Sequence, residues 1–99
     1  MSEVVITKSN RKDKKMQAII DGKKTVHFGQ KNASDYTIHN DPERKERYIK
    51  RHNQKENWGK DGFKTAGFYS RWLLWNKKTL EGSVTDLNKK CKSVSFKLR

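Results

Sequence analysis

The chain has 99 residues, and its 24 lysines and arginines outnumber its 11 acidic residues, which gives a formal charge of +13. This length allows one modest hydrophobic core, so we expect residues 1–99 to form a single domain. The sequence has neither a signal-peptide core nor an uncharged run of about eighteen residues, which argues against secretion and against a membrane span. The single cysteine, Cys91, excludes an internal disulfide and favours a reducing, intracellular location. The excess positive charge indicates a polyanionic partner, such as nucleic acid, an acidic protein surface or anionic lipid.

Residues 1–31 are predicted to form strands. The segment EVVITKS is rich in β-branched residues, and two alternating segments follow it around Asp21-Gly22, a strong hairpin signal. A two-residue turn at Asp21-Gly22 would scatter the apolar side chains over both faces. A three-residue loop of Ile20, Asp21 and Gly22, with Gly22 in the left-handed conformation, instead places four apolar side chains on one face: Met16, Ala18, Val26 and Phe28. We therefore predict the three-residue loop.

Two segments without periodicity are predicted to be loops. Residues 8–15 (KSNRKDKK) are dominated by basic side chains, and residues 29–40 contain glycine, serine and asparagine. We expect Tyr36 and Ile38 to anchor the second loop.

A helix is predicted from about residue 42 to 53, because Asp41 is a good N-cap, Pro42 suits the first helical position and Glu43 adds an acid to the first turn. At about 100° per residue, one side of this helix carries four residues: Lys45, Tyr48, Ile49 and His52. An adjacent stripe carries three arginines: Arg44, Arg47 and Arg51. The helix is therefore amphipathic, and its arginines should face solvent.

Residues 41–92 are predicted to contain three helices. The second follows Thr65 as its N-cap, and its sequence TAGFYSRWLLWN is apolar nearly all round, so we expect it to be the buried hub of the fold. The third follows a Thr79 cap and carries an apolar stripe that ends in Cys91, which predicts a buried and inert thiol. Residues 93–99 alternate as a closing strand that pairs with the N-terminal hairpin. The predicted fold is α+β, a small antiparallel sheet packed by about three helices.

No catalytic, metal or cofactor site is predicted. His27, His39, His52 and Cys91 are separated by 12, 13 and 39 residues, which matches no compact zinc motif. We assign His52 to the buried edge of its helix and the other two histidines to the polar surface. No glycine-rich phosphate loop occurs, and nothing in the pattern requires a metal-dependent nuclease built on surface acids: Asp35, Asp41 or Glu43. We therefore expect a protein without enzymatic activity.

Basic side chains in two clusters and one further lysine are the predicted anion-binding residues: Lys8, Arg11, Lys12, Lys14, Lys15, Arg44, Arg47, Arg51 and Lys55. Trp58 and Phe63 lie among basic residues and are candidates for stacking on nucleic-acid bases, although capping of the core is the favoured interpretation of both. No set of residues stands out as a reader of base sequence. Binding should therefore depend weakly on sequence and steeply on salt.

Several segments together are typical of one group of proteins: TVHFG, SDYTIHNDPERKERYIKRH, ENW, TAGFYSRWLLWNK and TL. On these segments, which span nearly the whole chain, it resembles a family of small, basic proteins of unassigned function encoded by nucleocytoplasmic large DNA viruses of algae and amoebae. The resemblance implies a virion-associated protein, located in the particle and in the host cytoplasm or nucleus, that binds viral DNA. A minor capsid or cement protein that packs against capsid subunits or the inner membrane is an alternative, and a host-directed interaction protein is another.

Overall fold

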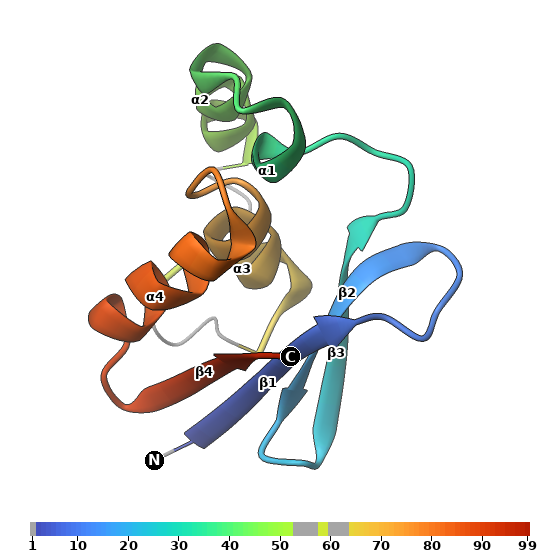
Figure 1. Cartoon of the computed structure of the whole chain (residues 1–99), viewed down its shortest axis with the longest axis vertical. Helices are drawn as coiled ribbons and strands as arrows, with labels where there is room; N and C mark the ends of the chain where they lie inside the picture. The colour runs from blue at the N-terminus through green and yellow to red at the C-terminus, as the bar shows by residue number, and fades with distance from the viewer. Residues whose placement is uncertain (1, 53–57, 60–63) are drawn as a thin grey trace.

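The computed structural model describes residues 2–52, 58–59 and 64–99, within which four strands form one sheet in the order β3-β2-β1-β4 (Figure 1). The strands are β1 (Ser2–Lys8), β2 (Lys14–Ile20), β3 (Lys24–Gln30) and β4 (Val94–Leu98). The first three form the predicted antiparallel meander, and the α+β class is confirmed. The prediction of an antiparallel sheet is wrong at β4, which pairs parallel to β1. The intervening helices return the chain to the end of the sheet where β1 begins, and parallel neighbours need such a crossover.

The turn between β2 and β3 contains residues 21–23, one position later than predicted. The backbone of Asp21 donates to the Glu3 carbonyl, and the Asp21 carboxylate accepts from the Glu3 N–H, each at 2.8 Å. Because these bonds hold Asp21 against β1, Ile20 stays in the strand and reaches the core. Gly22 has the predicted left-handed conformation, with φ of 68°. The predicted face is also correct, since Met16 lies opposite Phe28 and Ala18 opposite Val26.

The helical part of the chain comprises α1 (Tyr36–His39), α2 (Pro42–His52), α3 (Ala66–Tyr69), η2 (Ser70–Leu74) and α4 (Leu80–Lys90). The predicted caps are confirmed: Asp41 accepts from the Glu43 N–H, Thr65 from Phe68 and Thr79 from Gly82. The second predicted helix is α3 continued by one π-helical segment, η2. None of the helices in the described part of the chain combines the length and the apolar character needed to cross a membrane.

The loop predicted over residues 29–40 contains the short helix α1. Tyr36 is buried, as expected of an anchor, but Ile38 is 63% exposed and does not anchor the loop. Asp35 caps α1 by accepting from the Thr37 N–H at 2.9 Å, and Asn40 ends the helix in the left-handed conformation. An Asx cap therefore organises this segment, and the apolar side chain of Ile38 takes no part.

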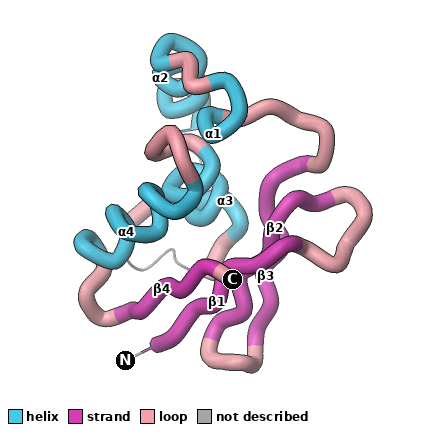
Figure 2. The backbone as a smooth tube through the Cα atoms, viewed as in Figure 1, coloured by secondary structure: helices cyan, strands magenta, loops and turns pink. Residues whose placement is uncertain are grey.

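The core lies between one face of the sheet and the layer formed by α3, η2 and α4 (Figure 2). Tyr69 is fully buried at its centre, stacked on Phe28 at a centroid distance of 5.4 Å and edge-on to Phe68 and Phe96. Cys91 is 5% exposed, which confirms its predicted burial. Figure 1 shows α1 and α2 beyond α3, at the end of the molecule opposite the β2–β3 turn.

A polar cluster joins the end of η2 to α4. Asn76 Nδ2 donates to Asp86 Oδ2 at 2.8 Å, Lys90 Nζ lies 3.0 Å from the same oxygen, and Ser83 Oγ accepts from the Lys77 N–H. Burial alone would raise the pKa of Asp86, but the hydrogen bonds from Asn76 and Lys90 outweigh it and hold the pKa below its ordinary value. The ionised carboxylate therefore stabilises the contact between η2 and α4.

Candidate anion-binding groove

Two adjoining hollows lie between α2 and the rest of the domain. The larger, of about 480 Å³, is lined by parts of β2, β3, the loop before α1, α2, α3 and η2, and we call it the cleft. The smaller, of about 310 Å³, is lined by three arginines of α2 and is called the arginine pocket. The two share five lining residues, so they form one continuous groove, named here the basic groove: Ala33, Ser34, Tyr48, Arg51 and Trp75.

The amphipathic pattern of α2 explains why its arginines face this groove. The predicted inner side of the helix is partly buried, and Tyr48 stacks on Trp75 at 4.5 Å with nearly parallel rings. Lys45 Nζ donates to the Asn76 carbonyl at 2.7 Å, and burial together with the charges of nearby cations lowers the pKa of Lys45. These contacts fix the rotation of α2 about its axis, which leaves the predicted stripe exposed: Arg44, Arg47 and Arg51.

Among the described residues, the charged side chains that line the arginine pocket are all positive. Arg44, Arg47 and Arg51 all line it, and no acidic side chain of the described residues does. Arg47 also lines a separate hollow with Glu43, Glu46 and Lys50, where Glu46 and Lys50 form an ion pair at 3.7 Å. The guanidinium groups are thus concentrated on the side of α2 that faces the groove.

Lys15 does not contribute a free charge to the groove. Its Nζ donates to Asp35 Oδ2 at 2.6 Å and also to the Ala33 carbonyl, and the two charged side chains are only 18% and 3% exposed. Because Asp35 compensates the Lys15 charge inside the protein, we remove Lys15 from the predicted anion anchors. Its role is structural, since it ties β2 to the loop that borders both hollows.

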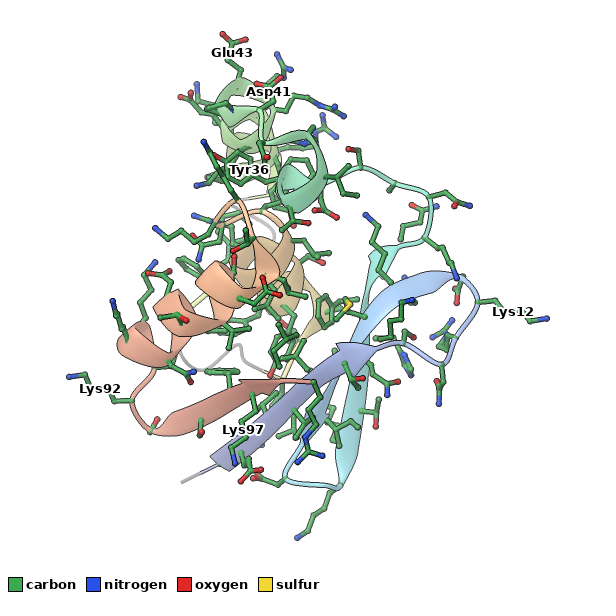
Figure 3. All side chains as sticks on the ribbon, in the orientation of Figure 1. Lys12, Tyr36, Asp41, Glu43, Lys92 and Lys97 are labelled. Atoms are coloured by element: carbon green, nitrogen blue, oxygen red, sulfur yellow. The ribbon has the colours of Figure 1, made fainter. Side chains whose placement is uncertain are left out.

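The other members of the N-terminal basic cluster separate in space. Lys14 lines the cleft, because β2 begins at this residue and not after residue 15 as predicted. Arg11 is held by Asp13 through two hydrogen bonds of 3.2 and 3.0 Å. Figure 3 shows Lys12 at the tip of the β1–β2 loop, pointing away from α2. Lys8 is exposed at the end of β1. Of this cluster, Lys14 alone joins the α2 arginines as an uncompensated cation at the groove.

Trp58 and Phe63 were the candidates for base stacking, and the structure describes only Trp58. The Trp58 ring lies parallel to Tyr48 at 6.3 Å, with the Arg71 guanidinium 5.6 Å from its centre, and the Trp58 carbonyl accepts from Trp72 Nε1 at 2.9 Å. These contacts favour packing of Trp58 against the domain. Phe63 and Lys55 lie outside the described residues.

The histidines do not gather into a metal site, and no group of three potential ligands occurs in the described ranges. His52 is partly buried at the edge of α2, as predicted, and its Nδ1 lies 3.1 Å from the Tyr48 carbonyl, so this nitrogen is the donor. The surface assignment of His39 is wrong. Its Nδ1 accepts from the Asp41 N–H at 2.9 Å, and its ring lies 5.3 Å from that of Trp75.

Polar residues of the cleft that were not predicted from the sequence include Ser34 and Ser70. Ser34 comes from a loop and Ser70 from the π-helical segment, so neither belongs to a periodic pattern. Asp35 offered the one usable signal nearby, because an Asp before a short polar and aromatic run is a typical N-cap. That signal would have predicted α1 and brought the preceding loop into the site.

Residues 4–52 match the model of a family of unknown function (DUF5754), and the matched range runs from β1 to the end of α2. It therefore includes Lys14, the Lys15–Asp35 pair and the arginine stripe, whereas α3 and η2 fall outside it. No curated protein and no solved structure matches the chain.

Proposed function

We propose that this protein binds nucleic acid through its phosphates, using the basic groove, with little dependence on base sequence and without catalysing a reaction. The arginine pocket is the observation that carries the proposal. It brings three guanidinium groups into one hollow, and its described lining residues include no acidic side chain. A planar guanidinium donates two parallel hydrogen bonds to a phosphate, which makes arginine well suited to this partner.

The overall charge supports the same proposal. A formal charge of +13 on 99 residues produces self-repulsion that a bound polyanion relieves. Internal pairing compensates only part of this charge, as at Lys15 and Arg11, while the α2 arginines and Lys14 face the groove. Phosphate contacts of this kind position a nucleic acid without reading its sequence.

The test is a salt series of nucleic-acid binding, measured by fluorescence anisotropy. The variant Arg44→Gln/Arg47→Gln/Arg51→Gln should bind at least tenfold more weakly than the wild type, and the slope of log affinity against log salt should fall by about 3. The matched control removes the same charge from exposed lysines that line neither hollow of the groove: Lys12→Gln/Lys89→Gln/Lys92→Gln. It should change the affinity by less than about threefold. Equal losses in both variants would show diffuse attraction to the whole surface and would refute the groove as the site.

The resemblance to proteins of large DNA viruses supports a more specific form of the proposal, in which the ligand is viral DNA inside the particle. Quantitative composition of purified virions separates this role from its alternatives. A DNA-bound protein leaves the particle with the genome, whereas a capsid or cement protein stays in the shell and binds little DNA at physiological salt. Absence from the particle would favour a host-directed role.

A further inference from the structure

The cleft is a feature that phosphate contacts alone do not explain. It is larger than the arginine pocket, and its volume of about 480 Å³ lies within the range of roughly 300–1,000 Å³ that is usual for small-ligand sites. Its walls are mostly uncharged: Phe28, Leu74 and Trp75 contribute apolar surface, and Gln30, Ser34 and Ser70 contribute amide and hydroxyl groups. The bases of a fully paired duplex are stacked and paired, so none of them can enter such a hollow without first leaving the stack. A ligand that fills the whole groove therefore needs an uncharged portion next to its anionic one.

The cations are divided between the two hollows of the basic groove. Arg44 and Arg47 line the arginine pocket only, Lys14 lines the cleft only, and Arg51 lines both. A strand that crosses the groove can thus place one phosphate at the arginines and another at Lys14, with the nucleoside between them over the cleft.

We propose that the basic groove binds single-stranded nucleic acid and that one unpaired nucleotide enters the cleft, with its flanking phosphates at the arginine pocket and at Lys14. This inference rests on the proposed function and specifies its ligand. Unpaired nucleotides expose base edges that side chains can contact, which a duplex conceals.

The aromatic residues of the groove limit how the base is held. Tyr48 is stacked on Trp75 at 4.5 Å and also on His52 at 4.3 Å, so its ring is already occupied by contacts with other rings of the protein. The base is therefore enclosed by the walls and hydrogen-bonded at its edge, and it does not stack on Tyr48. Serine hydroxyls and a glutamine amide both donate and accept hydrogen bonds, so the cleft accommodates each of the four bases.

Three fluorescently labelled ligands of equal length test the proposal at one salt concentration: a single strand, a duplex, and a single strand whose sugars lack bases. The wild type should bind the single strand about tenfold more tightly than the other two, a difference of about 1.4 kcal/mol. Equal affinity for the single strand and the strand without bases would overturn the inference, because the cleft would then recognise no base.

A variant that fills the cleft provides a second test of the proposal. Ala66 is exposed and lines the cleft, so Ala66→Phe adds bulk there without changing charge. It should lower single-strand affinity to the level of the duplex and leave the salt slope unchanged, because the slope counts phosphates. The control Thr85→Phe places the same bulk on an exposed site of α4 and should have no effect.

The two proposals fail in different ways. If Ala66→Phe leaves single-strand binding unchanged while the arginine variant weakens it, the cleft assignment is wrong and phosphate binding by the groove stands. If none of the three ligands shows salt-dependent binding, the proposed function is wrong, and the inference drawn from it falls with it.

Discussion

Substitution of Asp35 tests how the groove is built. The carboxylate is 3% exposed, pairs with Lys15 at 2.6 Å and accepts from the Thr37 N–H at the start of α1. Asp35→Ala leaves the Lys15 ammonium without its partner, which costs 3–5 kcal/mol for a fully buried pair. Because Lys15 is 18% exposed, we take about 3 kcal/mol for this part. Loss of the cap adds about 1 kcal/mol. The free energy of unfolding should therefore fall by about 4 kcal/mol.

Two further variants separate the contributions. Asp35→Asn keeps an oxygen that can cap α1 but removes the charge, so we expect a loss of about 3 kcal/mol. The double variant Lys15→Met/Asp35→Asn buries no unpaired charge and should recover about 2 kcal/mol relative to the sum of the two single variants. Urea unfolding followed by tryptophan fluorescence and by far-ultraviolet circular dichroism measures these three variants and the single variant Lys15→Met that the comparison needs, and coincident transitions check that unfolding is two-state.

The expected coupling between Lys15 and Asp35 can be contradicted by two results. If Asp35→Ala destabilises the protein by less than about 1 kcal/mol, or if the two single substitutions are additive, Lys15 and Asp35 do not form a buried pair in solution. Lys15 would then have to be returned to the set of free cations around the groove.

Four other substitutions have expected outcomes. Gly29 has φ of 77°, and an added Cβ would lie 2.7 Å from Leu74 Cδ1. Gly29→Ala should therefore lower the free energy of unfolding by about 3 kcal/mol, measured by urea unfolding. The control Gly22→Ala meets no atom within 4 Å and should lower it by about 1 kcal/mol. Burial raises the pKa of Tyr69, and its hydroxyl has no hydrogen-bond partner in the described part of the chain. Tyr69→Phe should therefore leave the free energy of unfolding unchanged or raise it by up to about 1 kcal/mol. A decrease of more than about 1 kcal/mol would show that the hydroxyl has a hydrogen-bond partner. The pKa of Asp86 is lower in the folded than in the unfolded protein, so its contribution to the free energy of unfolding is present above the unfolded pKa of about 3.9 and is lost as pH falls through the folded value. Asp86→Asn should therefore weaken the dependence of stability on pH between about pH 5 and 2. An unchanged pH dependence would contradict this assignment.

Local patterns account for the features that the sequence predicted well. The caps at Asp41, Thr65 and Thr79 depend on a side chain and a backbone N–H two or three residues later, and all three form. The exposed and partly buried sides of α2 follow from helical periodicity alone. The arginine stripe was predicted for the same reason, because the angular position of each arginine depends only on its place in the helix.

The remaining features depend on contacts between distant segments. Nothing local to Lys15 indicates that Asp35 compensates its charge, since the two meet only when β2 and the loop before α1 are placed together. The parallel direction of β4 depends on the path of the helices that precede it and not on the alternation of its own side chains. The cleft was missed for the same reason, because six segments line it.

The pairing of β1 with β4 also bears on how the domain is made. During translation β1 and β2 emerge early and can pair at once, but the other edge of β1 has no partner until β4, the last described element, has been synthesised. Until then Val4 and Ile6 lack the cover of Phe96, and an open strand edge with apolar neighbours is prone to pair with other chains. Closure pairs Ser2 with Val94, two positions that are far apart in the sequence, and such pairing is slow for a small domain. The nascent chain is therefore most vulnerable to aggregation before β4 docks, and a high positive charge that keeps copies apart protects it during that interval.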